Sequence, residues 1–370
     1  MTNYTKLPAI LLLADGTVYY GKAAGKIGTT TGEICFNTGM TGYQEIFTDP
    51  SYFGQIMVTT NAHIGNYGIH REEIESDSIK IAGLVCKNYS VGYSRKEASE
   101  SIQDYFQDEN IVGISDIDTR ALVRHIRNKG AMNGIISSEI TDLEELKAKL
   151  SAVPSMDGLE LSSQVSTKEP YFYGNPDATY KIAALDLGIK KNILRNFEAR
   201  DMYVQVFPAK TSFEEMNKWN ADGYFISNGP GDPSAMPYAI ETVKQILAAD
   251  KPLFGICLGH QLLAEANGIG TMKMFNGHRG LNHPVKNIIK NHCEVTSQNH
   301  GFGVIAEEVK KSDKVEITHL NLNDQSIEGI RVKGKKAFSV QYHPESSPGP
   351  HDSRYLFDDF LEMIKSDLAW

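Results

Sequence analysis

Residues 251–261 read Lys-Pro-Leu-Phe-Gly-Ile-Cys-Leu-Gly-His-Gln and set Cys257 between two glycines. The apolar run at 253–256 predicts a buried strand and residues 258–266 predict a helix, so Cys257 occupies an abrupt strand-to-helix turn. Such a turn holds a thiol at the positive end of a helix, which stabilises a thiolate. Gly255 and Gly259 have no Cβ atoms and leave the room that a nucleophile elbow needs. The stretch alone fits either a nucleophile or a buried core cysteine, the usual environment of a free thiol.

A histidine and a carboxylate near the C-terminus favour the nucleophile. His343-Pro344-Glu345 follows a predicted strand at 337–342. A carboxylate two residues past a histidine, across a proline of restricted φ, can orient the imidazole ring and hold its charged form. Cys257, His343 and Glu345 together make the set that acyl transfer through a thioester requires.

Two loops supply further parts of the predicted site. Residues 227–233 read Ser-Asn-Gly-Pro-Gly-Asp-Pro, and their backbone N–H groups, with the amide of Leu258, can stabilise a developing oxyanion. The alternative for this loop is a plain turn. Residues 298–302 read Gln-Asn-His-Gly-Phe, which suits a small polar substrate, whereas His300 alone is expected to be structural. A phosphate-binding loop is not expected, because the chain has no G-x-x-x-x-G-K-[ST] motif.

The pattern from residue 181 onward predicts an α/β domain built on a parallel sheet. Short apolar strands alternate there with longer helices, which implies a sheet covered on both faces. The nucleophile then lies at the carboxyl end of the sheet, where ligands bind in such folds. We predict strands at 182–187, 203–207, 224–227, 253–256, 294–297, 315–318 and 337–342, and helices at 190–199, 237–249, 258–266 and 353–364.

Residues 1–150 predict a separate, smaller α/β domain. A helix is expected at 117–129, capped by Asp116 or Asp118, and a second at 141–150, opened by Thr141 in a capping box. Frequent Pro and Gly at 151–179 indicate a linker, and residues 180–370 form the second domain.

Composition limits the classes of partner. The chain has 370 residues, a net charge of −9 and four widely spaced cysteines. The negative charge argues against nucleic acid, and the cysteines fit a reducing compartment without disulfides. The apolar run at 7–14 is too short to span a bilayer, so a cytoplasmic protein without a membrane partner is expected. The pair Lys190-Lys191 is expected to be solvated. No metal is expected, since the remaining histidines lack a ligand spacing: His260, His278, His283 and His351.

Three of these motifs together resemble the class I, or triad, glutamine amidotransferases: residues 255–261, residues 227–233 and His343-Pro344-Glu345. The likeness extends to the small, glutamine-hydrolysing subunit of carbamoyl phosphate synthase. Motifs that look like this family occur at 299–302 and 347–352, and in the N-terminal half at 32–33, 36–45, 48–52 and 116–120. The N-terminal motifs are specific to this subunit rather than to amidotransferases at large. One departure is Leu281, where a second glycine is expected.

The resemblance implies a mechanism and a substrate. In the family's pattern Cys257 attacks the side-chain amide of L-glutamine, His343 acts as base and then as acid, and Glu345 orients His343. The amides of Leu258 and Gly231 look like the oxyanion hole, and water resolves the γ-glutamyl thioester. By the same analogy, the residues that contact glutamine are Ser51, Gly229, Gly231, Leu258, Gln261, Asn299, Gly301 and Phe302.

The resemblance also implies a partner. In this family ammonia passes through a tunnel to a large subunit, which uses bicarbonate and ATP with magnesium to make carbamoyl phosphate for the pyrimidine and arginine pathways. The residues at 1–150 would dock that subunit, and pairs of subunits would be able to assemble further into heterotetramers. This chain itself would need no cofactor or metal.

Three rival interpretations carry different predictions. Glutaminases that serve anthranilate, guanylate or aminodeoxychorismate synthesis lack the first 150 or so residues. A free-standing cysteine hydrolase such as a γ-glutamyl peptidase would act without a partner. A non-catalytic scaffold would not need Cys257, His343 and Glu345 intact.

Overall fold

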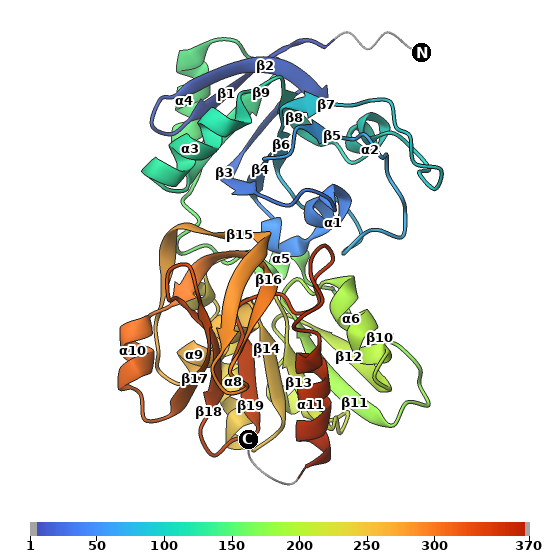
Figure 1. The fold of residues 1–370 in the computed structure, drawn as a ribbon, viewed down its shortest axis with the longest axis vertical. Coiled ribbons are helices and arrows are strands. Elements are labelled where there is room, and N and C mark those ends of the chain that lie inside the picture. The colour runs from blue at the N-terminus through green and yellow to red at the C-terminus, as the bar shows by residue number, and fades with distance from the viewer. Residues whose placement is uncertain (1–5, 367–370) are drawn as a thin grey trace. The chain divides into compact units, whose positions relative to one another are not determined.

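The computed structural model of the chain describes residues 6–366 and divides into two compact units, which meet in sequence at Met156 and Asp157. Figure 1 shows the N-terminal unit in blue to green and the C-terminal unit in green to red. The predicted class, a smaller N-terminal α/β domain followed by an α/β domain based on a parallel sheet, is confirmed, and the sheet of the second domain is mixed, with parallel strands at its centre.

The N-terminal unit is a closed barrel in the order β1-β2-β8-β6-β4-β3-β9. Antiparallel pairing of the first and last of these strands closes the barrel, and β3, β4, β6 and β8 run parallel. Apolar side chains fill the interior, because alternate strand residues point inward. The strands are β1 (Pro8–Leu13), β2 (Val18–Gly25), β3 (Thr29–Asn37), β4 (Gln55–Thr59), β6 (Gly83–Val85), β8 (Val112–Ser115) and β9 (Met132–Ser137), with the small pair β5 (His63–Ile64) and β7 (Asn88–Tyr89) outside the barrel. The helices are α1 (Tyr43–Thr48), η1 (Pro50–Tyr52), α2 (Ile102–Asp108), α3 (Thr119–Lys129) and α4 (Leu143–Ser151).

The helix ends show which predicted caps form. Asp118 caps α3 by accepting a hydrogen bond from the amide of Ala121, and Gly130 ends the helix with a φ of 92°. The capping box predicted for Thr141 is wrong. Asp142 caps α4 instead, because its carboxylate accepts hydrogen bonds from two amides of the first turn, those of Glu144 and Glu145.

The C-terminal unit contains one ten-stranded sheet in the order β10-β12-β11-β13-β14-β19-β18-β17-β15-β16. The five strands from β12 to β19 in this order are parallel, and both flanks are antiparallel. The strands are β10 (Tyr171–Tyr173), β11 (Tyr180–Asp186), β12 (Met202–Pro208), β13 (Gly223–Ile226), β14 (Leu253–Ile256), β15 (Thr271–Asn287), β16 (His292–Val304), β17 (Val315–Asn321), β18 (Ile327–Val332) and β19 (Ala337–Val340). The helices are α5 (Ser162–Val165), α6 (Lys191–Glu198), α7 (Phe213–Asn217), η2 (Pro233–Ala235), α8 (Pro237–Ala248), α9 (Leu258–Ala266), α10 (Ala306–Lys311) and α11 (Tyr355–Lys365).

Each face of this sheet has its own core. Along β11, Ala183 and Leu185 pack with residues of α8 and α9, whereas Ile182 and Ala184 pack with residues of α6 and α11. This alternation is the two-residue period of a strand buried on both faces. It explains why the strands read as continuous apolar runs.

The segment 157–179, expected to lie in a linker, contains structure. It holds α5 and β10, and β10 pairs antiparallel with β12 at the edge of the large sheet. The segment belongs to the C-terminal unit.

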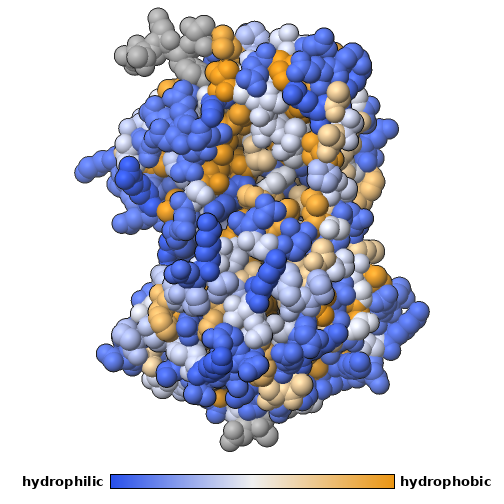
Figure 2. All heavy atoms as spheres, turned by 180° about the vertical axis from the view of Figure 1, so that it is seen from behind, coloured by the Kyte–Doolittle hydropathy of each residue, from blue (hydrophilic) through white to orange (hydrophobic). Residues whose placement is uncertain are grey.

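The surface is mostly hydrophilic. Figure 2 shows polar side chains over most of one face, with apolar side chains gathered mainly over the N-terminal unit. None of the helices in the described part of the chain, residues 6–366, is long and apolar enough to cross a membrane.

Candidate active site

Three neighbouring parallel strands bring the predicted catalytic motifs to one edge of the sheet. The glycine-rich loop follows β13, Cys257 follows β14, and the segment with His343 and Glu345 follows β19. Because β13, β14 and β19 are adjacent and parallel, their carboxyl ends meet at the same edge. The sheet therefore brings together three motifs that are far apart in the sequence, at 227–233, 257 and 343–345.

The turn at Cys257 has the geometry of a nucleophile elbow. Cys257 stands at the N-terminus of α9 with a φ of 54° and a ψ of −102°, a strained conformation for a residue with a side chain. A Cβ atom on Gly255 would lie 2.7 Å from the carbonyl oxygen of Gly259, and one on Gly259 would collide with the carbonyl oxygen of Ile226. Both glycines are thus required by the close approach of backbone.

The thiol of Cys257 is buried, with 3% of the residue exposed. Its Sγ donates to the carbonyl oxygen of Asn299 at 3.5 Å, and the side-chain amide of Gln341 donates to Sγ at 3.8 Å. The second contact is one that an amide N–H can also make with a thiolate.

His343 is held between two elements. Its backbone N–H donates to the carbonyl oxygen of Ser297 on β16, and its Nδ1 donates to Oε1 of Glu345 at 2.7 Å. This hydrogen bond leaves Nε2 as the ring nitrogen that is open to a further partner. Nε2 is buried, and within residues 6–366 it has no hydrogen-bond partner.

Lys190 completes this charge arrangement. Its Nζ lies 3.0 Å from Oε1 of Glu345 and also donates to the carbonyl oxygen of Ser346 at 2.5 Å. Lys190 is only 2% exposed, so the expectation of a solvated Lys190-Lys191 pair is wrong for Lys190. The lysine follows β11 and reaches the same edge of the sheet as the catalytic motifs.

The charges of these groups shift each other's pKa. Burial would raise the pKa of Glu345, but the nearby Lys190 and His343 outweigh it and lower this pKa to about 2. Burial would lower the pKa of His343, but the charges of Glu345 and Cys257 outweigh it and raise this pKa to about 10. Glu345 is therefore a carboxylate at neutral pH, and it favours an imidazolium at His343.

The glycine-rich loop lies against the elbow. A Cβ on Gly229 would collide with the carbonyl oxygen of Leu187 and reach within 3.0 Å of the Leu258 side chain. Gly231 has a φ of 101°, and a Cβ there would lie 2.7 Å from the carbonyl oxygen of Leu159. Leu258 is the first residue of α9, so its amide has no acceptor within the helix. These backbone groups have the setting that an oxyanion hole requires.

The other residues predicted to contact glutamine, outside the glycine-rich loop, fall into three places. Gln261 on α9 donates from its side-chain amide to the carbonyl oxygen of Phe302 at 2.7 Å and to Oε1 of Gln341 at 3.2 Å. Asn299, Gly301 and Phe302 lie on β16, beside α9. Ser51 lies in η1 of the N-terminal unit, where its amide donates to Asp49, so its contact with substrate stays a prediction.

Lys190 and Gln341 are the residues of this site that the sequence did not indicate. Lys190 stands after a strand end, which is a signal for a site residue, but its neighbour Lys191 made the pair look like a solvated face. Gln341 stands between β19 and His343, and its side chain contacts both Gln261 and Cys257.

Comparison with known proteins places both units in families. Residues 11–136 match the carbamoyl-phosphate synthase small chain, CPSase domain, and residues 183–363 match the glutamine amidotransferase class-I domain. The carbamoyl phosphate synthase small chain of Chlorobaculum tepidum is 49% identical over 97% of this chain and 98% of that protein. The small chains of a Synechococcus species and of Vibrio vulnificus are 48% and 47% identical, over 96% and 98% of this chain and 93% and 99% of those proteins. The chain therefore belongs to the carbamoyl phosphate synthase small chain family, and with its class I glutamine amidotransferase domain it is a glutaminase subunit of that family.

Proposed function

We propose that Cys257 is the nucleophile that attacks the side-chain amide carbon of L-glutamine. The thiol gives up its proton to Nε2 of His343, and the new C–S bond forms as the amide carbonyl becomes an oxyanion. The amides of Leu258 and Gly231 would stabilise that oxyanion. His343 then protonates the leaving nitrogen, so the C–N bond breaks and ammonia departs from a γ-glutamyl thioester.

The second half of the reaction returns the thiol. Water attacks the thioester carbon while His343 accepts its proton, and glutamate leaves as the C–S bond breaks. Throughout both halves Glu345 would keep the ring oriented and balance its positive charge, and Lys190 would keep Glu345 ionised. No step requires a metal or a cofactor in this chain.

Glutamine recognition is the next part of the proposal. The amide side chains of Gln261 and Asn299 offer both donors and acceptors for the α-amino and α-carboxylate groups, and Gly229, Gly231 and Gly301 allow backbone to approach. Phe302 would form an apolar wall. Ser51 would contribute from the N-terminal unit.

The ammonia would then pass to a large chain. That partner would combine it with bicarbonate, using ATP and magnesium, to form carbamoyl phosphate for pyrimidine and arginine synthesis. We assign docking of the large chain to the N-terminal domain at 1–150, where Tyr20 and Met40 are 68% and 73% exposed. The C-terminal amidotransferase domain would run from 180 to 370. The four free cysteines fit a reducing cytoplasm.

The observation that supports this function most is the meeting of Cys257, His343 and Glu345 at adjacent carboxyl ends of one sheet. Its test is Cys257→Ser in the complex with a large chain. Glutamine-dependent synthesis should fall at least about 10³-fold while ammonia-dependent synthesis stays, because only the nucleophile is lost. Cys293→Ser, at an exposed cysteine, is the matched control and should keep both activities.

Two outcomes would contradict the proposal. Glutamine-dependent synthesis that survives Cys257→Ser would exclude this nucleophile. A glutaminase rate of the isolated chain that a large chain does not raise would instead favour a free-standing hydrolase.

A further inference from the structure

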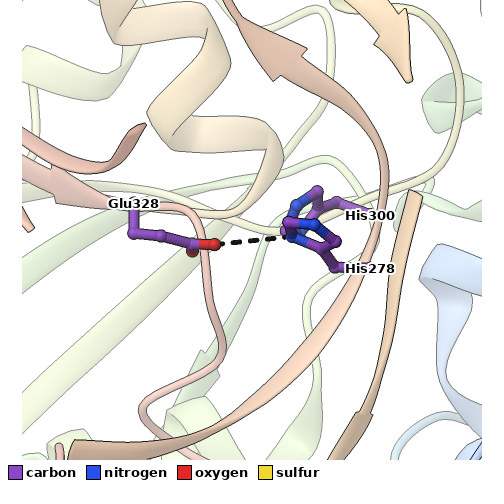
Figure 3. Close-up of side chains that lie close together, drawn as sticks. All are labelled: His278, His300 and Glu328. Atoms are coloured by element: carbon purple, nitrogen blue, oxygen red, sulfur yellow. Dashed lines mark ion pairs between the residues drawn. The ribbon is translucent and has the colours of Figure 1, made fainter. Parts of the chain in front are cut away.

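Outside the proposed active site, the C-terminal unit gathers two histidines and a glutamate from three strands. His278 lies on β15, His300 on β16 and Glu328 on β18. Each offers one nitrogen or carboxylate oxygen, and these atoms all lie within 4.8 Å of one another. Figure 3 shows Glu328 reaching toward the two imidazole rings, with its carboxylate paired to His278.

The potential donor atoms of this cluster are buried and unsatisfied. Glu328 is fully buried and His300 is 5% exposed. Among the residues that the structure describes, Nδ1 of His300 and Oε2 of Glu328 have no hydrogen-bond partner, and Nδ1 of His278 has only its 3.5 Å ion pair with Glu328. Burying a polar atom without a partner costs free energy, so these atoms in one place need an explanation. A bound cation would supply the missing partner to all of them.

Neighbouring side chains orient two members of the cluster. Nε2 of His278 donates to Oδ2 of Asp324 at 2.9 Å, and Nδ1 faces Glu328, 3.5 Å from Oε1. The side-chain amide of Asn321 donates to Oε1 of Glu328 at 2.8 Å. A carboxylate behind a histidine and a hydrogen bond to a ligating carboxylate are the usual supports of metal ligands.

We propose that His278, His300 and Glu328 bind one divalent transition-metal ion of the zinc type. Two imidazoles and one carboxylate are a donor set that zinc accepts, with further positions open to water. Zinc ligands lie about 3.4 Å apart when each is about 2.1 Å from the ion, so ligand atoms that now lie within 4.8 Å of one another need to close by at most about 1.4 Å.

This site lies outside the proposed catalytic residues, but His300 belongs to the strand that contacts Cys257. His300 stands between Asn299 and Gly301, and the carbonyl oxygen of Asn299 accepts from the Cys257 thiol. A bound ion would fix the strand that carries these residues. Metal binding itself does not rest on the proposed function, so its test measures the metal and not the glutaminase.

The test is a zinc titration of the full chain against a chromophoric chelator, in a Cys257→Ser, Cys293→Ser background that removes two thiols as competing ligands. We expect one zinc per chain. Glu328→Gln keeps the side-chain volume but removes the charge, and it should weaken zinc binding at least about 100-fold. The matched control is His292→Gln, which removes a histidine 3.0 Å from the buried Glu294 and should leave the affinity unchanged.

Asp324→Asn guards against a variant that fails to fold, because Asp324 lies at an exposed turn. It removes only the support of His278 and should weaken zinc binding about 10-fold. Cobalt in place of zinc should give a visible absorption band that Glu328→Gln abolishes. The proposal is overturned if the folded parent chain binds no zinc, or if Glu328→Gln and Asp324→Asn bind it as tightly as the parent.

Discussion

Two buried histidines of the C-terminal unit, His343 and His260, show how partners rather than burial decide a charge. His343 is 2% exposed and His260 is fully buried. His260 lies in the first turn of α9, and its Nδ1 contacts the Ser339 hydroxyl at 2.9 Å. Burial therefore lowers the pKa of His260 to about 3, whereas Glu345 and Cys257 overcome burial and raise that of His343 to about 10.

The difference teaches what a buried base needs. A hydroxyl partner leaves a buried ring neutral, but a carboxylate stabilises the charge that proton transfer creates. That carboxylate must itself remain charged in a buried site, and Lys190 performs this task for Glu345. His343 thus has the partners that a proton-transfer role needs, whereas His260 packs in the helix that follows Cys257.

Removing the carboxylate of Glu345 should abolish the difference between His343 and His260, and we expect it to have the largest effect on kcat. We expect Glu345→Gln to lower kcat for glutamine hydrolysis about 10²- to 10⁴-fold, because the imidazolium at His343 loses its counter-charge. The measurement is steady-state glutamate release by the complex with a large chain. Glu294→Gln is the control, since Glu294 is another buried carboxylate outside the site. A kcat within about threefold of the parent would refute the role of Glu345.

Lys190→Met tests the ion pair between Lys190 and Glu345, and it should have a smaller effect on activity than Glu345→Gln. Without the ammonium, the pKa of Glu345 should rise from about 2 toward its usual value, because only His343 then opposes the effect of burial. We expect kcat/KM to fall about 10- to 100-fold, and the acid limb of its pH profile to move to higher pH.

The pH profile separates this positioning role from a loss of structure. Lys191→Met changes the neighbouring, less buried lysine and should leave the profile in place. A Lys190→Met enzyme with reduced activity but an unmoved acid limb would show that Lys190 acts in some other way.

The contributions of the two histidines to the free energy of unfolding should depend on pH with opposite signs. The folded pKa of His260, about 3, lies below the ordinary histidine value of 6.5, so below about pH 6.5 the unfolded chain binds a proton that the folded chain does not. The free energy of unfolding then falls as pH falls. The folded pKa of His343, about 10, lies above 6.5, so its contribution is fully present below pH 6.5 and is lost as pH rises toward 10.

His260→Gln isolates the first of these two slopes. Between about pH 6 and about pH 5 the variant should lose about 1 kcal/mol less unfolding free energy than the parent. Urea unfolding at the two pH values measures this difference, and His351→Gln, at an exposed histidine, is the control. Equal slopes in the variant and the parent would show that His260 is not held neutral.

The parts of this site that the sequence predicts are the ones encoded by short local motifs. The elbow, the glycine-rich loop and the His343–Glu345 pair each occupy a few consecutive residues after a strand, so a strand prediction places them at one edge. Lys190 was missed because its burial depends on Glu345, far along the chain. The cluster at His278, His300 and Glu328 was missed for the same reason, since three strands supply one residue each.

The N-terminal unit shows the same limit for the fold. Its first hairpin and its two longest helices are visible as local patterns, but closure of the barrel depends on pairing between β1 and β9 at opposite ends of the unit. The cap of α4 shows that even a local choice can fail. Thr141 and Asp142 both suit the position, and only the backbone path selects Asp142.

Ser339→Ala should have the smallest effect, and it tests the inert side of the comparison. The variant removes the hydroxyl that contacts His260 Nδ1 and leaves that nitrogen buried, which should lower the free energy of unfolding by about 1–2 kcal/mol. The kcat for glutamine hydrolysis and its pH profile should change less than about twofold, because His260 takes no part in proton transfer. Ser326→Ala, at an exposed turn, is the control for loss of a hydroxyl. A large fall in kcat with normal stability would mean that the hydroxyl acts on Cys257 through α9, and the division between a chemical and a packing histidine would then have to be abandoned.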